Sequence, residues 1–453
     1  MTHVVICGAG IAGISAAYAL SVRYGLSHVT VVDPLPPLTL TSDKSTEAYR
    51  NFWPGPDDSM IQLMNASIAL MEELARRTDN RFLLNRRGYM YATARQDVAD
   101  ALVEAAHRAA AMGAGPVREH RDGREYVPSP AEGFENVPEG LDVLADPHTI
   151  REHFPYLSPD TRLVLHVRKA GWLSAQQLGM VMWEEAREHG VRLLQGEVVG
   201  VDIRAGQVAY VWVRTRQGEQ SLPADVFVNA AGPFVDRVAA LAGGDLPIVW
   251  ERHLKVAFQD HLGILPRHAP LLIWNDPQFI PWDEEERAFL QEIEGGQRLL
   301  EEFPPGVHTR PEGAGGSTVV LGLWDYEVQV EQPSFPIDLD PVYPDVVLRG
   351  LTRMIPGLRV YWDRAPRPRV DGGYYTKTRE NLPLIGPVGW KGAYVIGALS
   401  GFGIMASCAA GDLLARYVVG LDVPEYARAF HPRRHADPAW YPHLKAWGSQ
   451  WQL

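Results

Sequence analysis

The sequence has little cysteine: only Cys7 and Cys408 occur among 453 residues. They stand far apart in the chain, so neither forms the C-x-x-C spacing of a metal site or part of a disulfide framework. We expect two reduced thiols, as is usual for a cytoplasmic protein. Neither is expected to be a nucleophile, because Cys7 lies in a predicted buried strand.

The sequence also lacks an excess of basic residues and any long apolar run. It has 43 Lys and Arg against 55 Asp and Glu, a net charge of -12, which argues against a nucleic-acid partner. No apolar run approaches the roughly 18 residues of a membrane span. No basic region precedes an apolar one at the N-terminus, so we expect no leader. The length suffices for two or three domains.

Residues 3–20, HVVICGAGIAGISAAYAL, predict a strand, a glycine-rich turn and a helix. Gly8 permits the tight turn, Gly10 lets the backbone approach a pyrophosphate, and Gly13 lets the helix pack on the strand. The N-terminus of the helix then points free N–H groups at the phosphates. A second predicted strand, 28–33, ends in Asp33, where a carboxylate would bind a ribose hydroxyl. The stretch therefore predicts a dinucleotide site.

The identity of the dinucleotide stays open at this point. The carboxylate of Asp33 disfavours a 2′-phosphate and hence NADP, but it suits both NAD and the ADP half of FAD. The chain does not continue directly into a doubly wound sheet. Instead, the polar stretch 40–56, LTSDKSTEAYRNFWPGP, follows. Further along we predict helices at 60–77, at 178–189 and up to about 419, and strands at 191–194, 197–203, 225–232 and 393–398.

Three segments give the sequence a resemblance to a known family. They are VNAAGPFVD (228–236), GGYYTKTRENLPLIGPV (372–388) and GALSGFGIMAS (397–407). Because it has these three segments and the glycine-rich turn in this order, the chain resembles the FAD-dependent D-amino-acid oxidase superfamily over nearly its full length. The resemblance is to the branch of glycine oxidase, sarcosine oxidase and dimethylglycine dehydrogenase.

The resemblance implies an α/β fold with two domains. A discontinuous, Rossmann-like FAD-binding domain would comprise residues 1–80, 150–240 and 370–453. An α+β substrate domain with an antiparallel sheet would comprise 81–149 and 241–369. Residues 281–305 form an acidic insertion in the latter, most simply interpreted as a solvated helix.

The resemblance also assigns residues to FAD. It places 401–405 beside the flavin ring, where a helix N-terminus would stabilise the negative charge of the reduced ring. The residues expected to contact FAD are Gly8, Gly10, Ile11, Ala12, Gly13, Asp33, Pro34, Lys44, Ser45, Thr46, Val199, Ala230, Ala231, Gly232, Gly401, Phe402, Gly403, Ile404 and Met405.

The implied reaction is oxidation of the C–N bond of an amino acid or N-substituted amine, by hydride transfer to flavin N5. A carboxylate on the substrate needs a cationic anchor, and Arg50 is the first candidate. Tyr374 and Tyr375 would shape the pocket, and His253 and Lys255 would face it. His253 is either a neutral base or a satisfied, partly buried side chain.

The sequence departs from this branch at several positions. No histidine lies between residues 29 and 106, and Gly373 stands where a flavin-linking cysteine would fall. We therefore expect noncovalent FAD. Two lysines that assist oxygen in sarcosine oxidases are replaced by Val320 and Met405. The electron acceptor is then oxygen, activated elsewhere, or another carrier.

Two other functions remain open. One is an FAD-dependent dehydrogenase of 2-hydroxy acids or glycerol phosphate; the other is a flavin subunit of a larger electron-transfer complex. The expected partner is a small amine or amino acid whose identity the sequence does not specify. A homo-oligomer is also open.

Overall fold

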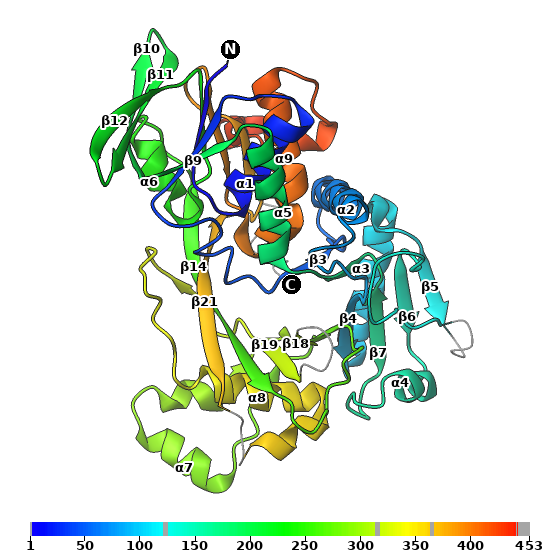
Figure 1. Ribbon diagram of the computed structural model, residues 1–453. Coiled ribbons are helices and arrows are strands. Elements are labelled where there is room, and N and C mark those ends of the chain that lie inside the picture. Colours follow the sequence, from blue (N-terminus) through cyan, green and yellow to red (C-terminus); the bar gives the residue numbers. More distant parts are fainter. Residues whose placement is uncertain (1, 121–125, 313–317, 363–366, 441, 443–453) are drawn as a thin grey trace.

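A six-stranded sheet assembled from distant parts of the chain forms the upper half of the molecule in Figure 1. The computed structural model describes residues 2–120, 126–312, 318–362, 367–440 and 442. Five of the six strands are parallel, and β22 joins the edge antiparallel. The strand order is β22 (Leu384–Pro387), β23 (Ala393–Gly397), β13 (Val226–Asn229), β1 (Val4–Cys7), β2 (Val29–Asp33) and β9 (Arg192–Gln195).

Continuous apolar runs explain why these segments form inner strands. All four residues of β1 and all four of β13 are buried, which requires cover on both faces of the sheet. One face is covered by α1 (Ile11–Tyr18), which continues into the π-helical turn η1 (Ala19–Arg23), and by α5 (Ala175–Glu188) and α9 (Gly403–Val419). The other face meets the three-stranded sheet of β10 (Glu197–Arg204), β11 (Gln207–Thr215) and β12 (Gly218–Pro223).

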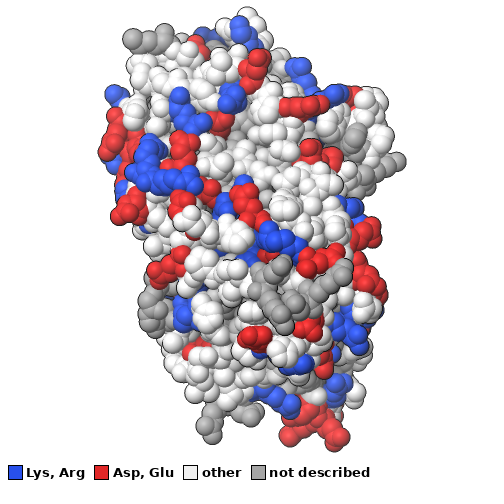
Figure 2. Space-filling view, turned by 90° about the vertical axis from the view of Figure 1, so that its right-hand side faces the viewer, with Lys and Arg blue, Asp and Glu red and all other residues white. Residues whose placement is uncertain are grey.

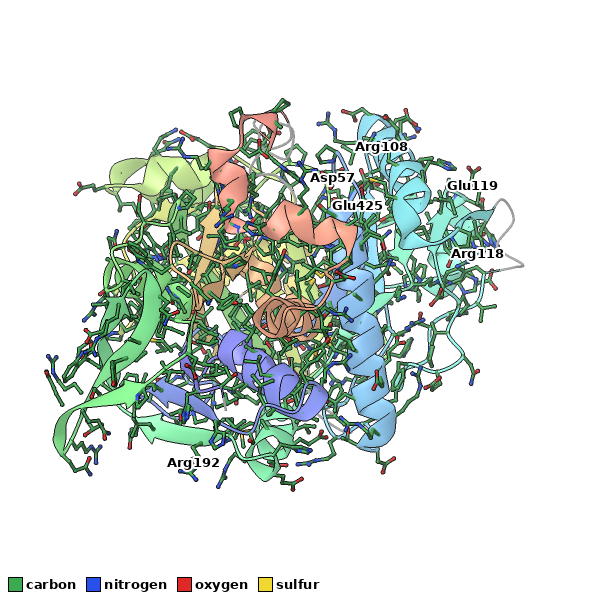
Figure 3. The ribbon with its side chains drawn as sticks, turned by 90° about the horizontal axis from the view of Figure 1, so that it is seen from above. Asp57, Arg108, Arg118, Glu119, Arg192 and Glu425 are labelled. Carbon is green, nitrogen blue, oxygen red and sulfur yellow. The ribbon has the colours of Figure 1, made fainter. Side chains whose placement is uncertain are left out.

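Helix α9 lies at the centre of the helical layer. Figure 3 shows it from above, between α1 and the long α2 (Ser59–Arg77), while the labelled Arg118, Glu119 and Arg192 lie at the periphery. By length and composition the stretch Ser400–Val419 could cross a membrane, with a mean hydropathy of 1.3. However, 67% of its apolar window is buried inside the protein, as in a core helix.

A ten-stranded sheet forms the second large element. Its main path is β20 (Gln329–Val330), β14 (Ile248–Gln259), β19 (Val319–Leu323), β18 (Val307–Pro311), β15 (Leu271–Trp274), β4 (Tyr89–Thr93), β7 (Leu163–Val167), β6 (Leu141–Leu144) and β5 (Val117–His120). The tenth strand, β21 (Arg369–Thr378), pairs with β14. Most pairs are antiparallel; β15–β4 and β5–β6 are parallel. The long strands β14 and β21 rise from this sheet toward the six-stranded one (Figure 1).

The remaining elements surround these two sheets. They are β3 (Ala48–Arg50) with β8 (Ala170–Trp172), β16 (Gln278–Phe279) with β17 (Glu302–Phe303), α3 (Gln96–Ala109) with η2 (Ala110–Ala114), α4 (Pro147–His153), α6 (Val235–Ala240), α7 (Glu284–Glu292), α8 (Tyr343–Met354), and the short turns η3 (Gly232–Phe234), η4 (Gly296–Leu300), η5 (Pro356–Tyr361), η6 (Ser400–Phe402), η7 (Glu425–Phe430), η8 (Pro432–Ala436) and η9 (Pro438–Trp440).

The α/β fold class predicted from the sequence is confirmed, with two refinements. The large sheet is mixed rather than purely antiparallel. In addition, β7 and β21 fall within ranges assigned to the FAD-binding domain, yet their backbones hydrogen-bond to β4 and β14 of the large sheet. Any domain boundary has to run through those ranges. The acidic helix predicted within 281–305 is α7. Asp283 and Glu286 form a capping box at its N-terminus.

Acidic and basic side chains are interspersed over the face shown in Figure 2. No broad field of one sign covers that face, which fits the modest net charge of -12.

Close packing of α9 on α1 gives a test of this arrangement. A Cβ on Gly411 would lie 2.6 Å from the backbone C and O of Ser15. In an open helix, Gly→Ala stabilises by about 1 kcal/mol, but here the added methyl has to push two helices apart. We expect Gly411→Ala to lower the free energy of unfolding by about 1–3 kcal/mol.

The measurement is the melting temperature of the variant against wild type. Gly200→Ala is the matched control, because its Cβ would meet only Trp212 atoms at 3.5 Å or more. An unchanged or higher melting temperature for Gly411→Ala would contradict the close helix packing.

Candidate active site

The glycine-rich turn lies where only glycine fits. Gly8 has φ +114°, and a Cβ there would lie 2.3 Å from the Ala230 carbonyl oxygen at the end of β13. A Cβ on Gly13 would lie 1.9 Å from the Gly8 carbonyl oxygen. The turn is therefore wedged between α1 and the neighbouring strand. The backbone N–H groups at the start of α1 consequently face the carboxyl edge of the sheet, where ligands of such sheets bind.

Side chains from β2 and from the loop that follows it hold the glycine-rich turn in place. The Asp33 carboxylate accepts hydrogen bonds from the Ala9 N–H at 2.7 Å and the Leu35 N–H at 2.8 Å. Burial raises the pKa of Asp33 above its usual value, partly offset by these two donors. Ser42 Oγ accepts from the Ile11 N–H at 3.0 Å. Ser42 was not among the predicted residues, although it lies in the polar stretch 40–56.

Three adjoining cavities run from this turn into the molecule. The outer cavity, of about 580 Å³, lies along the carboxyl edge of the six-stranded sheet. It is lined by twelve of the predicted site residues: Gly8, Gly10, Ile11, Ala12, Asp33, Pro34, Val199, Ala230, Ala231, Gly232, Tyr374 and Gly403. Gly13 and Phe402 line none of the three cavities, because Gly13 packs on the turn and Phe402 is buried in the core.

The middle cavity, of about 70 Å³, adjoins the outer one through Ile11, Ser42 and Gly403, which line both. Its other lining residues include eight of the predicted set: Lys44, Ser45, Thr46, His253, Lys255, Tyr375, Gly401 and Ile404. The two strands β14 and β21 thus bring residues of the large sheet to the start of α9.

The inner cavity, of about 30 Å³, adjoins the middle one through Thr46, Tyr375 and Gly401. Arg50 and Met405 of the predicted set line it as well. Four further residues complete its wall, none of them predicted from the sequence: Tyr89, Leu271, His308 and Asp325.

Arg50 is a buried cation at the inner cavity, with 2% of its surface exposed. β3 holds it by pairing with β8, and its Nε donates to the Phe52 carbonyl at 3.2 Å. Its guanidinium lies over the rings of Trp53 and Tyr89, 4.5 and 5.6 Å from their centroids. Arg50 Nη2 is buried without a hydrogen-bond partner among the described residues. Such a donor is costly unless a ligand satisfies it.

His253 is an ion-paired side chain rather than a free base. Its Nδ1 lies 2.7 Å from Asp325 Oδ1 and its Nε2 lies 3.3 Å from Glu251 Oε2. Burial alone would lower the pKa of His253, but these two carboxylates outweigh it and raise the pKa to about 9. Of the two interpretations left open for His253, the structure favours the satisfied one. Lys377 Nζ extends the network to Glu251 at 3.0 Å.

Neighbouring tyrosines on β21 point to different cavities, as the alternation of a strand requires. The ring of Tyr375 stacks on His253 at 3.7 Å between centroids and lines the middle and inner cavities. Tyr374 lines the outer cavity instead, and its hydroxyl accepts from the Ser334 N–H at 3.1 Å. The prediction that both tyrosines shape one substrate pocket therefore needs correction for Tyr374.

The two predicted lysines differ in their surroundings. Lys255 Nζ donates to the Ser45 carbonyl at 2.9 Å, and burial lowers its pKa. Lys44 is more exposed and pairs with Asp43 at 2.8 Å and Asp371 at 3.1 Å. Met405 and Val320 stand where the resemblance places two lysines of sarcosine oxidases. Met405 lines the inner cavity, whereas Val320 lies in the apolar core of the lower half of the molecule.

A sequence signal for part of this site exists. Glu251, His253 and Lys255 alternate along one face of the half-buried strand β14, and three ionisable residues in this pattern are a signal that can be read from the sequence. Asp325 and His308 give no such local signal. Among the described residues, no group of three or more His, Cys, Asp or Glu could hold a metal ion.

The charge state of His253 gives a test of the network. Its ion pairs stabilise the fold below pH about 6.5, and this contribution is lost as the pH rises through about 9. We expect NMR of ring-labelled histidine to show a His253 signal that titrates near pH 9, assigned by its absence in His253→Gln. His166 is the control, because burial lowers its pKa to about 3. A His253 midpoint near pH 6.5 would contradict the ion pairs.

Comparisons with known proteins agree with this geometry. The family model DAO, described as FAD dependent oxidoreductase, matches residues 3–417. No curated protein matches the sequence. The solved structures that resemble this one include an L-proline dehydrogenase from P. horikoshii, with a TM-score of 0.72 and 18% identity over 96% of this chain and 98% of that one.

Two further solved structures are oxidases. A glycine oxidase from Geobacillus kaustophilus has a TM-score of 0.70 and 17% identity, covering 95% of this chain and 98% of its own. An iminodiacetate oxidase from a Chelativorans species has a TM-score of 0.68 and 19% identity, covering 95% and 99%. At such identities the likeness concerns the fold alone. The family match, by contrast, spans most of the chain: the protein belongs to the DAO family of FAD dependent oxidoreductases.

Proposed function

We propose that the protein oxidises the C–N bond of an amino acid or N-substituted amine that carries a carboxylate. The observation that carries this proposal is the series of cavities, which leads from the glycine-rich turn to Arg50, a buried arginine whose Nη2 has no hydrogen-bond partner among the described residues. The similar solved structures are named for proline, glycine and iminodiacetate, all of which carry a carboxylate.

The residues of the outer cavity fit the ADP half of FAD. The positive φ of Gly8 and the contact with Ala230 leave an open backbone surface for the pyrophosphate. The carboxylate of Asp33 stands at the end of β2, where a ribose hydroxyl would be bound. Pro34 and Val199 also line this cavity.

The residues from Lys44 to Thr46 and from Gly401 to Met405 would hold the ring. Helix α9 begins at Gly403, beside the middle cavity. The positive end of its dipole favours negative charge there. Bound FAD supplies an acceptor, at its N5 atom, for a hydride from the carbon next to the substrate nitrogen. The protein's part is to orient the substrate and to exclude water from the inner cavity.

Arg50 is the proposed anchor of the substrate carboxylate. Its free Nη2 and its position at the closed end of the site suit a bidentate hydrogen bond to a carboxylate. The aromatic rings of Trp53 and Tyr89 fix the plane of the guanidinium. The substrate carbon would then lie between Arg50 and the ring.

We further propose that FAD is bound noncovalently. No cysteine is among the residues that line the middle and inner cavities, and both ring nitrogens of His253 are engaged by carboxylates.

The electron acceptor is oxygen or another carrier. A cytoplasmic location agrees with two unpaired cysteines.

The experiment that tests the function is anaerobic reduction of the purified holoprotein. Amino acids and N-methyl amino acids are added in turn, and the flavin absorbance is followed. The proposal predicts bleaching by at least one carboxylate-bearing amine, and release of the flavin into the supernatant after acid precipitation. Bleaching by 2-hydroxy acids or glycerol phosphate alone would contradict amine oxidation.

Substitution of the anchor gives a sharper prediction. Arg50→Lys keeps a positive charge but loses the bidentate geometry. Because hydrogen bonds to charged groups contribute about 1.5–3 kcal/mol, we expect a loss of roughly 10- to 100-fold in kcat/KM for the best substrate. The same amine without its carboxylate is the control substrate and should be affected little. An equal loss for both substrates would contradict the anchoring role.

A further inference from the structure

His308 is a buried histidine at the closed end of the site. It is the second residue of β18, a strand between β15 and β19 in the large sheet. It has 5% of its surface exposed and lines the inner cavity together with Arg50, Asp325 and Tyr375. The resemblance gives it no role.

One hydrogen bond determines the tautomer of His308. Its Nδ1 lies 2.9 Å from the Gly306 carbonyl oxygen, which can only accept, so Nδ1 carries the proton. Gly306 adopts φ +105°, a conformation suited to glycine, and its N–H donates to the Trp274 carbonyl at 2.8 Å. The turn before β18 therefore fixes the ring, and Nε2 retains its lone pair.

Burial is the main reason why the His308 ring stays neutral. It lowers the pKa of His308, the Gly306 carbonyl and Asp325 raise it, and the cations of Arg50 and His253 lower it further. Tyr89 and Tyr375 also line the cavity, but their hydroxyl groups carry no charge at neutral pH because burial raises their pKa. Among the described residues Nε2 has no hydrogen-bond partner, so it is available to a ligand in the cavity.

The other ionisable residues of the site are less suited to accept a proton. Both nitrogens of His253 face carboxylates, and its raised pKa keeps it protonated. Lys255 donates to a backbone carbonyl. Asp325 is paired with the His253 cation, which lowers its pKa against the effect of burial and makes it a weak base.

We infer that His308 is the base that takes the proton from the amino group of the substrate. This rests on the function proposed above. Removal of a hydride from carbon requires a lone pair on the neighbouring nitrogen, but most amines are protonated at pH 7. One N–H bond of the substrate ammonium breaks, its electron pair stays on nitrogen, and the proton forms a bond to His308 Nε2. The hydride then leaves the carbon for bound FAD, which is the oxidant, and the imidazolium returns its proton to water.

The lining of the inner cavity supports the step. Arg50 and His308 line the same cavity. The amino group of an α-amino acid lies only two bonds from its carboxylate carbon, so a carboxylate held by Arg50 brings that group toward His308. Asp325 is a positioning residue here, since its negative charge stabilises the imidazolium that forms.

Two variants separate proton transfer from hydrogen bonding. His308→Asn keeps a donor for the Gly306 carbonyl, and His308→Gln keeps an acceptor near the position of Nε2. Neither can take a proton at neutral pH. The rate of anaerobic flavin reduction, divided by the dissociation constant of the substrate, is measured from pH 6 to pH 10 for the holoprotein and both variants.

We expect both variants to lose about 100- to 1,000-fold at pH 7, the usual contribution of a general base. The loss should shrink tenfold per pH unit as the pH approaches the pKa of the amine, because free amine then needs no base. Wild type should fall only at acid pH, where His308 is protonated. His166→Asn, in a buried histidine outside the cavities, is the matched control and should follow wild type.

A loss of the same size at every pH would show that His308 only supports the structure, and would overturn the inference while leaving amine oxidation intact. A variant with wild-type rates at pH 7 would overturn it equally. If no amine reduces the wild-type flavin, the proposed function fails, and the inference fails with it. Melting temperatures of both variants identify any loss that arises from misfolding.

Discussion

The contact between the Gly8 turn and the end of β13 is the constraint on which the rest of the structure depends. Because a Cβ at Gly8 would meet the Ala230 carbonyl at 2.3 Å, the turn can press directly against the neighbouring strand. This contact directs the N-terminus of α1 toward the carboxyl edge of the sheet. The same edge receives β23 and the start of α9, which packs on α1 through Gly411. Segments from both ends of the chain thus meet around one elongated site.

Ionisable side chains line all three cavities. The outer cavity is lined by many glycine, alanine and proline residues, and its charged residues are Asp33, Glu197, Arg214 and Arg237. The inner one is lined by Arg50, Asp325 and His308, and Asp325 pairs with His253 of the middle cavity. Carboxylates surround His253 and raise its pKa, whereas burial lowers the pKa of His308 and the cations of Arg50 and His253 add to that effect. Environments that separate the protonation of similar groups are typical of acid–base sites.

Much of this architecture could be predicted from local sequence, and the exceptions have physical reasons. The glycine spacing and Asp33 lie within 33 residues, so their chemistry is readable as a motif. Arg50 was expected near the cofactor and lines the inner cavity. His308 and Asp325 come from loops and strands far from these motifs, and only pairing in the large sheet brings them together. The pairing of β7 and β21 with the large sheet could not be read from the sequence for the same reason, since strand pairing is a nonlocal property.

The measurement that tests the central claim most directly is cofactor binding to the apoprotein. The claim is that a single elongated site, from Asp33 to Arg50, holds one whole FAD molecule. Titration by absorbance and fluorescence should give one FAD per chain, with FMN binding far more weakly because it leaves the outer cavity of about 580 Å³ empty, and with ADP competing for that cavity. Equal affinity for FMN and FAD, or no competition by ADP, would contradict the account.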